Sequence, residues 1–371
     1  MLKSPVIFHS LNLKSKDYII ITNMKGVFTV KRKILIALAF VMAGLLSLAL
    51  REEREFTRHG SAMNTLIRIT VYSHSDDALN DAYSMLNDID AKMSMFNPSS
   101  EIYKINELAG KKDFRPSKET LTVIQDSLKL YKITDGVFNP LIGAVTKLWK
   151  INQPTGVIPS QESIDIALNL TKIENVSISA DSVYLKHEGC FIDLGGISKG
   201  YASRAIADML RHKGVKSAII DLGGNIFALG KKTDGSNWKI GIRNPLDPAG
   251  SPLAAVSVND CAVITSGNYE RYKIIDGKKY SHFFDPETGK SVMSNLLSVT
   301  LITPDGSLGD GLATAFMICG IEKAKEILSR PDVPDNTGAV FVTQGNDGKP
   351  EVFATENLKD IIISAVDVKF F

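Results

Sequence analysis

The sequence predicts an α+β fold, in which a single mixed α/β catalytic domain follows an N-terminal hydrophobic segment. Strand-like and helix-like segments are mixed along the chain without the regular βαβ alternation of a doubly wound sheet. The 371 residues are 44% hydrophobic, which is enough to bury a sizeable core. No low-complexity stretch, solenoid period or linker divides the chain after its N-terminal region. We therefore expect one domain over residues 57–371.

The N-terminal region has the pattern of an export sequence. A basic cluster, Lys31–Lys33, precedes an apolar run from Ile34 to Leu50 and would stay in the cytoplasm. The run is slightly shorter than the ~20 residues of a spanning helix, so it fits a membrane anchor or a signal peptide. We expect this role for residues 24–56, with Met24 as the cleaner start and 1–23 as an extraneous extension. The domain would then face the periplasmic side of a bacterial inner membrane, or be released there after cleavage.

The first elements of the domain follow from periodicity. Alternating apolar residues predict a strand within 64–72, and Asp76 and Asp77 open a helix. Ser117 caps a second helix, which Gly136 ends. The inward faces of these elements contain Ile67, Ile69, Val71, Leu79, Tyr83, Leu86, Ile89, Met93, Leu121, Ile124, Leu128 and Tyr131.

Repeated turns and a broken helix organise the rest of the chain. Residues 176–187 predict a hairpin. Two copies of the sequence DLGG, at 193–196 and 221–224, each follow an apolar stretch that we predict to be a strand. The first copy leads into a helix and the second into another strand. Near the C-terminus, a helix from about Gly309 to Cys319 is followed by another from Ile321.

Charge and cysteine content exclude two classes of function. The 43 basic and 41 acidic residues leave a net charge of +2, so no overall basic field favours nucleic acid. The three cysteines lack CxxC spacing and build neither a zinc site nor an obvious disulfide framework. The function must therefore lie in local motifs.

Two motifs offer sites for a metal and an anion. Asp310 and Thr314 lie four apart on a predicted helix, so their oxygens share one face and suit Mg²⁺. Alternatively, Asp310 is a helix N-terminal acid and Thr314 bonds back along its own helix. In DLGGISKG, Gly195 and Gly196 let a ligand approach the backbone, and Lys199 adds positive charge. The alternative there is a tight strand-to-helix turn.

Three further residues allow both a functional and a structural interpretation. Phe138, in DGVFNP, either stacks on a flat ligand or fills the core. Arg271, in SGNYERY, either binds a phosphate or lies solvated on a strand. His282, in YSHFFDPETG, either serves a pocket or caps a strand at a polar turn. Taken singly, the motifs leave these alternatives open.

Taken together, the motifs resemble the ApbE family of FAD:protein FMN transferases, which covalently flavinylate other proteins. The resemblance covers roughly residues 63–315 and implies a T-fold-like catalytic domain. It rests, in order, on MSMFNPSSEIYKIN, GVFNPLIG, IDLGGISKGYA, LGGNIFALG, WKIGIRNP, TSGNYERY, YSHFFDPETG, SVTLITP and DGLATA. The chain departs from the family pattern at Gly311, usually alanine, at Asn139, usually aspartate, and at Phe284, usually aliphatic.

The resemblance implies a role for each matching position. It places Mg²⁺, or Mn²⁺ instead, on Asp310, Thr314 and the carbonyl of Gly196. His282 would be the general base or a support of the pyrophosphate, with Asp285 as the second candidate for the base. The residues that would contact FAD are Met63, Phe96, Val137, Phe138, Asn139, Asp193, Lys199 and Phe284.

The implied reaction is FMN transfer. A Ser or Thr hydroxyl of an acceptor protein attacks the riboflavin-side phosphorus of FAD, and AMP leaves. The expected acceptor is a subunit of a membrane electron-transfer complex with a Ser/Thr-Gly-Ala-type motif, and no nucleic-acid partner is expected. Three alternatives stay open: an Mg²⁺-dependent FAD pyrophosphatase giving FMN and AMP, a tethered FAD carrier, and an exported scaffold without a ligand. AMP release without an acceptor would identify the pyrophosphatase.

Overall fold

The computed structural model describes residues 32–42, 53–151 and 158–371. Residues 32–42 form a helix with exposed side chains, and Arg54–Phe371 form a separate compact unit. None of the helices in the three described ranges is long and apolar enough to cross a membrane. The predicted extension over 1–23 and the end of the apolar run lie outside the described residues, so the export segment stays a prediction.

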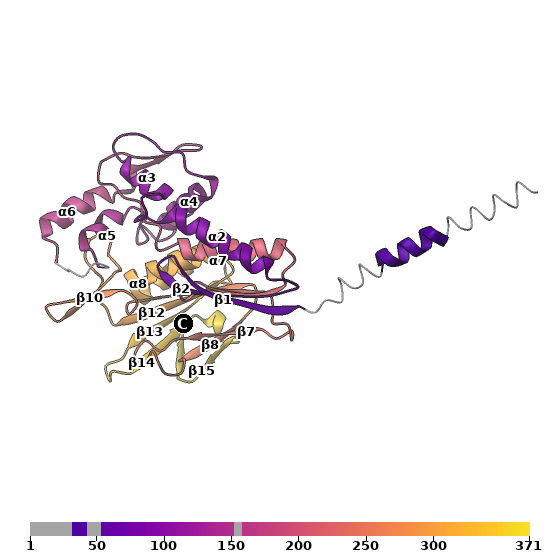
Figure 1. Ribbon diagram of the computed structural model, residues 1–371. Helices are drawn as coiled ribbons and strands as arrows, with labels where there is room; N and C mark the ends of the chain where they lie inside the picture. The colour runs from indigo at the N-terminus through magenta and orange to yellow at the C-terminus, as the bar shows by residue number, and fades with distance from the viewer. Residues whose placement is uncertain (1–31, 43–52, 152–157) are drawn as a thin grey trace, which may run out of the picture. The chain divides into compact units, whose positions relative to one another are not determined.

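The centre of the unit is a nine-stranded sheet (Figure 1). Its strands lie in the order β1-β2-β5-β6-β9-β12-β13-β14-β16, and all neighbours pair antiparallel except β14 and β16. The strands are β1 Arg54–Ala62, β2 Thr65–Ser73, β5 Ser217–Asp221, β6 Asn225–Leu229, β9 Cys261–Gly267, β12 Leu296–Thr303, β13 Gly338–Gln344, β14 Pro350–Ala354 and β16 Val368–Phe370. This largely antiparallel sheet with helices confirms the α+β class.

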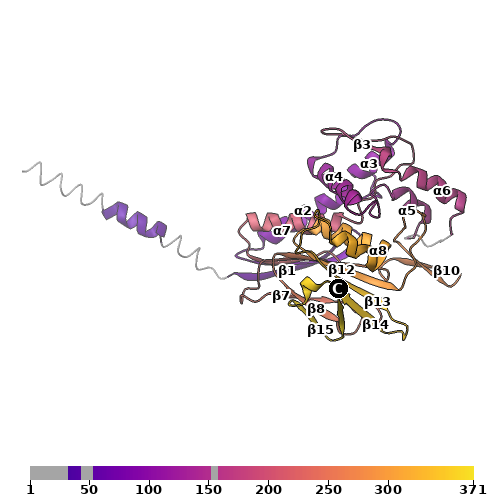
Figure 2. The ribbon, with the colours of Figure 1, turned by 180° about the vertical axis from the view of Figure 1, so that it is seen from behind.

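Helices cover one face of this sheet, and a small sheet covers the other (Figures 1 and 2). The alternation of side chains along β5 shows the two layers, because Ile220 belongs to the helical core and Ile219 to the opposite core. On the helical face lie α2 (Asp77–Met93), α7 (Ser198–His212) and α8 (Gly306–Leu328). The small sheet contains β7 (Trp238–Ile242), β8 (Ala254–Val258) and β15 (Ile362–Ser364).

Four further helices and two hairpins complete the described part of the unit. The predicted hairpin at 176–187 is confirmed, and the Ser117 hydroxyl caps its helix by accepting a hydrogen bond from the Thr120 amide. The helices are α3 (Glu101–Glu107), α4 (Lys118–Ile133), α5 (Gly143–Trp149) and α6 (Gln161–Leu170), with 3₁₀ turns η1 (Ile173–Asn175) and η2 (Glu356–Leu358). The hairpins pair β3 (Val176–Ile178) with β4 (Val183–Leu185) and β10 (Tyr272–Ile275) with β11 (Lys278–Ser281).

Helix α8 is interrupted where the sequence predicts two successive helices. Gly320 has φ 78° and ψ −178°, so the helical path breaks there. The part before the break packs on α7, β9 and β12. Asp310 and Thr314 both lie in this anchored part, which fixes their positions.

One expected strand is wrong. The stretch before the first DLGG turn forms only a single bridge, between Phe191 and Ile142. The cause is Asn106, whose side-chain oxygen accepts from the Ile192 amide at 2.7 Å and whose nitrogen donates to the Ile192 carbonyl at 2.9 Å. Because a buried side chain satisfies this backbone, no strand partner is needed.

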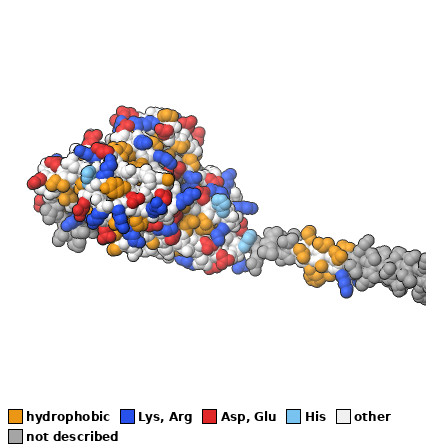
Figure 3. Space-filling model, turned by 90° about the horizontal axis from the view of Figure 1, so that it is seen from above, with side chains coloured by type: hydrophobic (Ala, Val, Ile, Leu, Met, Phe, Trp, Pro, Cys, Tyr) orange, Lys and Arg blue, Asp and Glu red, His pale blue; other side chains and the backbone are white. Residues whose placement is uncertain are grey.

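Charges of both signs are mixed on the surface. Figure 3 shows Lys and Arg interspersed with Asp and Glu on the face seen from above. Arg211 illustrates the pattern, since it pairs with Asp208 at 2.6 Å and with Asp260 at 3.0 Å.

Candidate active site

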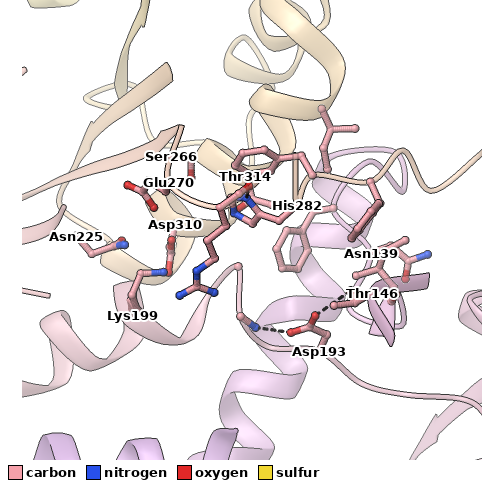
Figure 4. Close-up of a pocket in the computed structure, with 18 of the residues that line it drawn as sticks. Asn139, Thr146, Asp193, Lys199, Asn225, Ser266, Glu270, His282, Asp310 and Thr314 are labelled. Atoms are coloured by element: carbon pink, nitrogen blue, oxygen red, sulfur yellow. Dashed lines mark hydrogen bonds between the residues drawn. The ribbon is translucent and has the colours of Figure 1, made fainter. Parts of the chain in front are cut away.

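A cavity, here called the inner cavity, brings together polar residues that are distant in the sequence (Figure 4). Its walls come from the start of α7, the first part of α8, the end of β9, the two turns that flank the β10–β11 hairpin and the loop before α5. Eleven of the thirteen predicted site residues line it, namely Phe96, Val137, Phe138, Asn139, Asp193, Gly196, Lys199, His282, Phe284, Asp310 and Thr314.

Asp310 connects α8 to the start of α7. Its Oδ2 accepts a hydrogen bond from the Gly200 amide at 2.9 Å, which satisfies one of the free N–H groups in the first turn of α7. The helices approach so closely that a Cβ on Gly200 would lie 2.0 Å from the Gly306 carbonyl oxygen. Asp310 is only 2% exposed, and its Oδ1 makes no hydrogen bond to any described residue. Burying a carboxylate costs free energy unless it is paired, so the free oxygen favours binding of a positively charged partner.

Thr314 and Gly196 meet beside Asp310. A Cβ built on Gly196 would lie 3.0 Å from the Thr314 hydroxyl oxygen, so the first DLGG turn lies directly against α8. Carboxylate, hydroxyl and carbonyl oxygens are the ligand types that Mg²⁺ prefers, usually together with water or phosphate. Within the described ranges, no cluster of three or more His, Cys, Asp or Glu could hold a metal. The chemistry of this mixed oxygen set therefore fits a hard divalent cation.

His282 is fixed in one tautomer. Its Nδ1 lies 3.0 Å from the Arg271 carbonyl oxygen, and since a carbonyl only accepts, Nδ1 carries the proton. Nε2 is then free to accept a proton. Burial lowers the pKa of His282 to about 4, helped by the positive charges of Arg271 and Lys199 and opposed by the hydrogen bond to the Arg271 carbonyl. The imidazole is therefore neutral at pH 7, as a general base must be.

Two cations face the inner cavity without a carboxylate partner. Lys199, in the first turn of α7, and Arg271, after β9, form no ion pair within 4.0 Å among the described residues. Arg271 makes one long hydrogen bond, from Nη2 to the Asn64 carbonyl at 3.4 Å. Both cations are available for phosphate oxygens.

Two carboxylates lie close to these cations. Asp193 Oδ1 accepts from the Gly195 amide at 2.8 Å and Oδ2 from the Thr146 hydroxyl at 3.1 Å, as the dashed lines in Figure 4 mark. Burial raises the pKa of Asp193, while these two hydrogen bonds and then Arg271 and Lys199 oppose the rise. Desolvation also raises the pKa of Glu270, against the effect of the same cations.

The apolar part of the inner cavity is made by aromatic side chains. Phe138 and Phe284 are both 4% exposed, and Phe284 packs on Trp149 with ring centroids 5.7 Å apart. Phe96, by contrast, is 64% exposed at the mouth. These residues offer a buried and an open flat surface to a ligand with aromatic rings.

Asn139 holds its own loop. Its side-chain oxygen accepts from the Leu141 amide at 2.9 Å, and its nitrogen donates to the Thr171 carbonyl at 3.0 Å. An ionised aspartate could not donate to Thr171, so the asparagine matches the local hydrogen bonding of this chain.

Two predicted residues lie outside the inner cavity. Asp285 accepts from the Glu287 amide at 2.9 Å and from the Thr288 hydroxyl at 3.0 Å, so both of its oxygens stabilise their own turn. The geometry does not bring it to the site as a base. Met63 lies in the β1–β2 turn with φ 50° and lines an adjoining space, here called the outer cleft.

The outer cleft and the inner cavity are continuous. They share Phe96, Asp193, Gly195, Lys199 and Arg271. Two adjoining spaces suit an extended ligand better than a compact one.

The structure also adds residues that sequence reasoning missed. Asn225, Glu270 and Thr146 line the inner cavity. Asn225 is 2% exposed, and its side-chain oxygen has no hydrogen-bond partner in the described part of the chain. Asn225 follows the repeated DLGG sequence directly and Glu270 lies in the motif TSGNYERY, so the sequence carried an indication of both.

Comparison with known proteins identifies the family. The model of the ApbE family matches residues 63–340. The chain belongs to the ApbE family. It is 32% identical over 295 residues to the FAD:protein FMN transferase of Treponema pallidum (strain Nichols), covering 74% of this chain and 82% of that protein. It is 31% identical over 298 residues to the one from Klebsiella pneumoniae (strain 342), covering 80% and 92%.

Solved ApbE structures share the fold. The flavin transferase ApbE from Vibrio cholerae aligns with TM-score 0.73 and 25% identity, covering 83% of this chain and all of that chain. The ApbE protein of Thermotoga maritima aligns with TM-score 0.74 and 28% identity, covering 83% and 99%. The ApbE departure at Gly311 has a local cause, because a Cβ there would lie 2.2 Å from Leu130 Cδ1. Leu130 of α4 fills the space that an alanine would need.

Proposed function

We propose that this protein is an FAD:protein FMN transferase, which moves FMN from FAD to a Ser or Thr hydroxyl of an acceptor protein and releases AMP. The observation that carries the proposal is the inner cavity of an ApbE-family chain. It combines a neutral histidine, two unpaired cations and a set of hard oxygen ligands. These are the groups that are required to transfer a phosphoryl group from a pyrophosphate to a hydroxyl.

Our proposed chemistry is a direct displacement at phosphorus. The acceptor hydroxyl oxygen attacks the riboflavin-side phosphorus while its proton passes to Nε2 of His282. The bond from this phosphorus to the bridging oxygen breaks, and AMP leaves with that oxygen and its electron pair. Lys199 and Arg271, which line the same cavity, would balance the charge that builds on the phosphate oxygens.

We propose that Asp310, Thr314 and the Gly196 carbonyl hold Mg²⁺. Support comes from the free Oδ1 of Asp310 and from the contact of Thr314 with the Gly196 backbone. When bound, the cation would neutralise phosphate oxygens and stabilise the departing AMP. Mn²⁺ prefers the same oxygen ligands and is expected to substitute.

We propose that FAD extends through the inner cavity and the outer cleft. Its two ring systems need two apolar surfaces, which Phe138 with Phe284 and Phe96 with Met63 can supply. Val137 and Asn139 border the first surface, and Asp193 and Lys199 lie where the two spaces join.

We also propose that the enzyme is exported and works at the membrane. The basic cluster ahead of the apolar run supports export, although part of that run lies outside the described residues. A subunit of a membrane electron-transfer complex would be a fitting acceptor for such an enzyme.

The test is to incubate the chain with FAD, Mg²⁺ and an acceptor domain that contains a Ser/Thr-Gly-Ala-type motif. We expect a fluorescent acceptor band in a denaturing gel, and we expect a chelator to abolish it. Free FMN and AMP without any labelled acceptor would contradict the proposal, because water would then be the nucleophile.

A further inference from the structure

A second space adjoins the inner cavity. This space, here called the acceptor groove, is lined by Leu66, Arg68, Ile226, Ile240, Gly241 and Arg243 beyond its junction with the cavity. At the junction it shares Thr65, Gly223, Thr265, Glu270 and Arg271 with the inner cavity. Apart from Arg271, which we expect to bind phosphate oxygens, no residue that lines the groove is one that we assign to FAD, the cation or the base. The groove thus reaches the reacting region but leaves the FAD positions free.

The chemistry of the groove suits a polypeptide segment. Ile226 and Ile240 provide apolar surface, and Leu66 is 81% exposed at the rim. Arg68 pairs weakly with Asp221 at 3.7 Å, and Arg243 forms no ion pair within 4.0 Å among the described residues. The rim therefore favours a partner with apolar and acidic side chains.

The inner end of the groove presents backbone and an unsatisfied acceptor. Gly223 and Gly224, in the second DLGG turn, have φ 67° and 90°, and a Cβ on Gly223 would lie 2.1 Å from the Thr65 hydroxyl oxygen. The next residue is Asn225, whose buried side-chain oxygen lacks a partner and lines the inner cavity (Figure 4). An unpaired buried acceptor is costly, which favours a donor supplied by a ligand.

We propose that the acceptor groove binds the segment of the acceptor protein that bears the Ser or Thr hydroxyl. Asn225 Oδ1 receives an N–H of this segment, the apolar wall receives its flanking side chains, and Arg243 pairs with a carboxylate. The inference rests on the proposed transferase function and gives the acceptor a binding site that shares only Arg271 with the residues proposed to contact FAD.

The test compares Arg243→Glu and Leu66→Ser with a matched control, Lys239→Glu. Lys239 is exposed on the same strand region as Arg243 but does not line the groove, so it undergoes the same charge reversal elsewhere. The substrates are FAD and an acceptor domain with a Ser/Thr-Gly-Ala-type motif. The readouts are the KM for the acceptor domain, the Kd for FAD from flavin fluorescence, and the Tm.

We expect each groove variant to raise the KM for the acceptor domain about tenfold or more, with the Kd for FAD and the Tm unchanged. Lys239→Glu should stay within about twofold of wild type. A photo-crosslinking residue at position 66, and not at position 239, should become joined to the acceptor domain.

Two results would overturn the assignment of the groove. Groove variants with wild-type KM would exclude acceptor binding there, and a parallel loss of FAD affinity would assign the groove to FAD. Failure of the proposed function has a different outcome, because the wild-type enzyme would then label no acceptor at all. That result would contradict both the transferase function and the acceptor groove.

Discussion

His282 illustrates how one side chain is prepared for proton transfer. The Arg271 carbonyl takes the Nδ1 proton, so the lone pair at Nε2 is the available base. Burial and two nearby cations keep the ring neutral, with a pKa of about 4. Such a weak base accepts a proton only from a strongly acidic group, and a hydroxyl becomes strongly acidic as its oxygen bonds to phosphorus.

The first prediction concerns pH. Because the pKa of His282 is lowered from its ordinary value of 6.5 to about 4, the active neutral form persists down to mildly acidic pH. We expect kcat/KM for transfer to be flat near neutrality and to fall on acidification with a midpoint near 4. Rate profiles from about pH 3 to pH 8 measure this midpoint. A midpoint near 6.5 would show that the pKa of His282 is not lowered in the folded protein.

The second prediction is that His282→Asn separates catalysis from binding. Asparagine can still donate to the Arg271 carbonyl but has no basic nitrogen, so the local structure is kept. We expect transfer to slow by about 10²–10⁴-fold, the usual contribution of a general base, with the Kd for FAD within about threefold of wild type. A variant that lost FAD affinity and kept its turnover at saturating FAD would make His282 a ligand contact instead.

The third prediction concerns Asp310. Asp310→Asn keeps an oxygen for the Gly200 amide and removes the charge that a cation needs. We expect Tm to change by only a few degrees and transfer to fall by about 100-fold or more, in line with loss of a dominant electrostatic interaction. Mn²⁺ binding, followed by electron paramagnetic resonance, should weaken in parallel. Wild-type turnover or unchanged Mn²⁺ affinity in this variant would refute the metal assignment.

At the scale of elements, the site depends on the close contact of α7 with α8. Gly200 and Gly306 approach backbone to backbone, and Asp310 bridges the two helices at this point. The first DLGG turn then places Gly196 against Thr314. A small change in this contact would move all three oxygen ligands.

The fourth prediction follows from this contact. In Gly200→Ala the added methyl group would lie 2.0 Å from the Gly306 carbonyl oxygen, so the helices must separate. We expect the free energy of unfolding to fall by about 1–3 kcal/mol, the range for overpacking, together with a loss of transfer activity. Urea denaturation measures the first effect. A variant as stable and as active as wild type would mean that the helices can separate freely.

Elements governed by local patterns could be predicted from the sequence, and those governed by distant side chains could not. The Ser117 cap, the hairpin near residue 180 and the break at Gly320 all depend on neighbours in the chain. The stretch around Ile192 reads equally well as a strand, but Asn106, 86 residues away, takes its hydrogen bonds. Asp285 does not line the inner cavity, and both of its oxygens accept hydrogen bonds within its own turn.

At the scale of the whole molecule, Arg271 lies where the three spaces meet. It lines the inner cavity, the outer cleft and the acceptor groove. Motif order was enough to indicate most of the cavity residues, because most of the motifs contribute a lining residue to the same cavity. The groove residue Arg243 belongs to the motif WKIGIRNP, which indicated no role for it, because its place in the groove depends on how β7 packs into the core that it shares with β6 and β9.

The measurement that tests the central claim most directly is the ratio of AMP released to FMN attached to the acceptor domain. The account predicts one AMP for each attached FMN and almost no AMP when the acceptor domain is left out. AMP and free FMN appearing at the same rate with and without the acceptor would contradict it, because the enzyme would then hydrolyse FAD rather than transfer FMN.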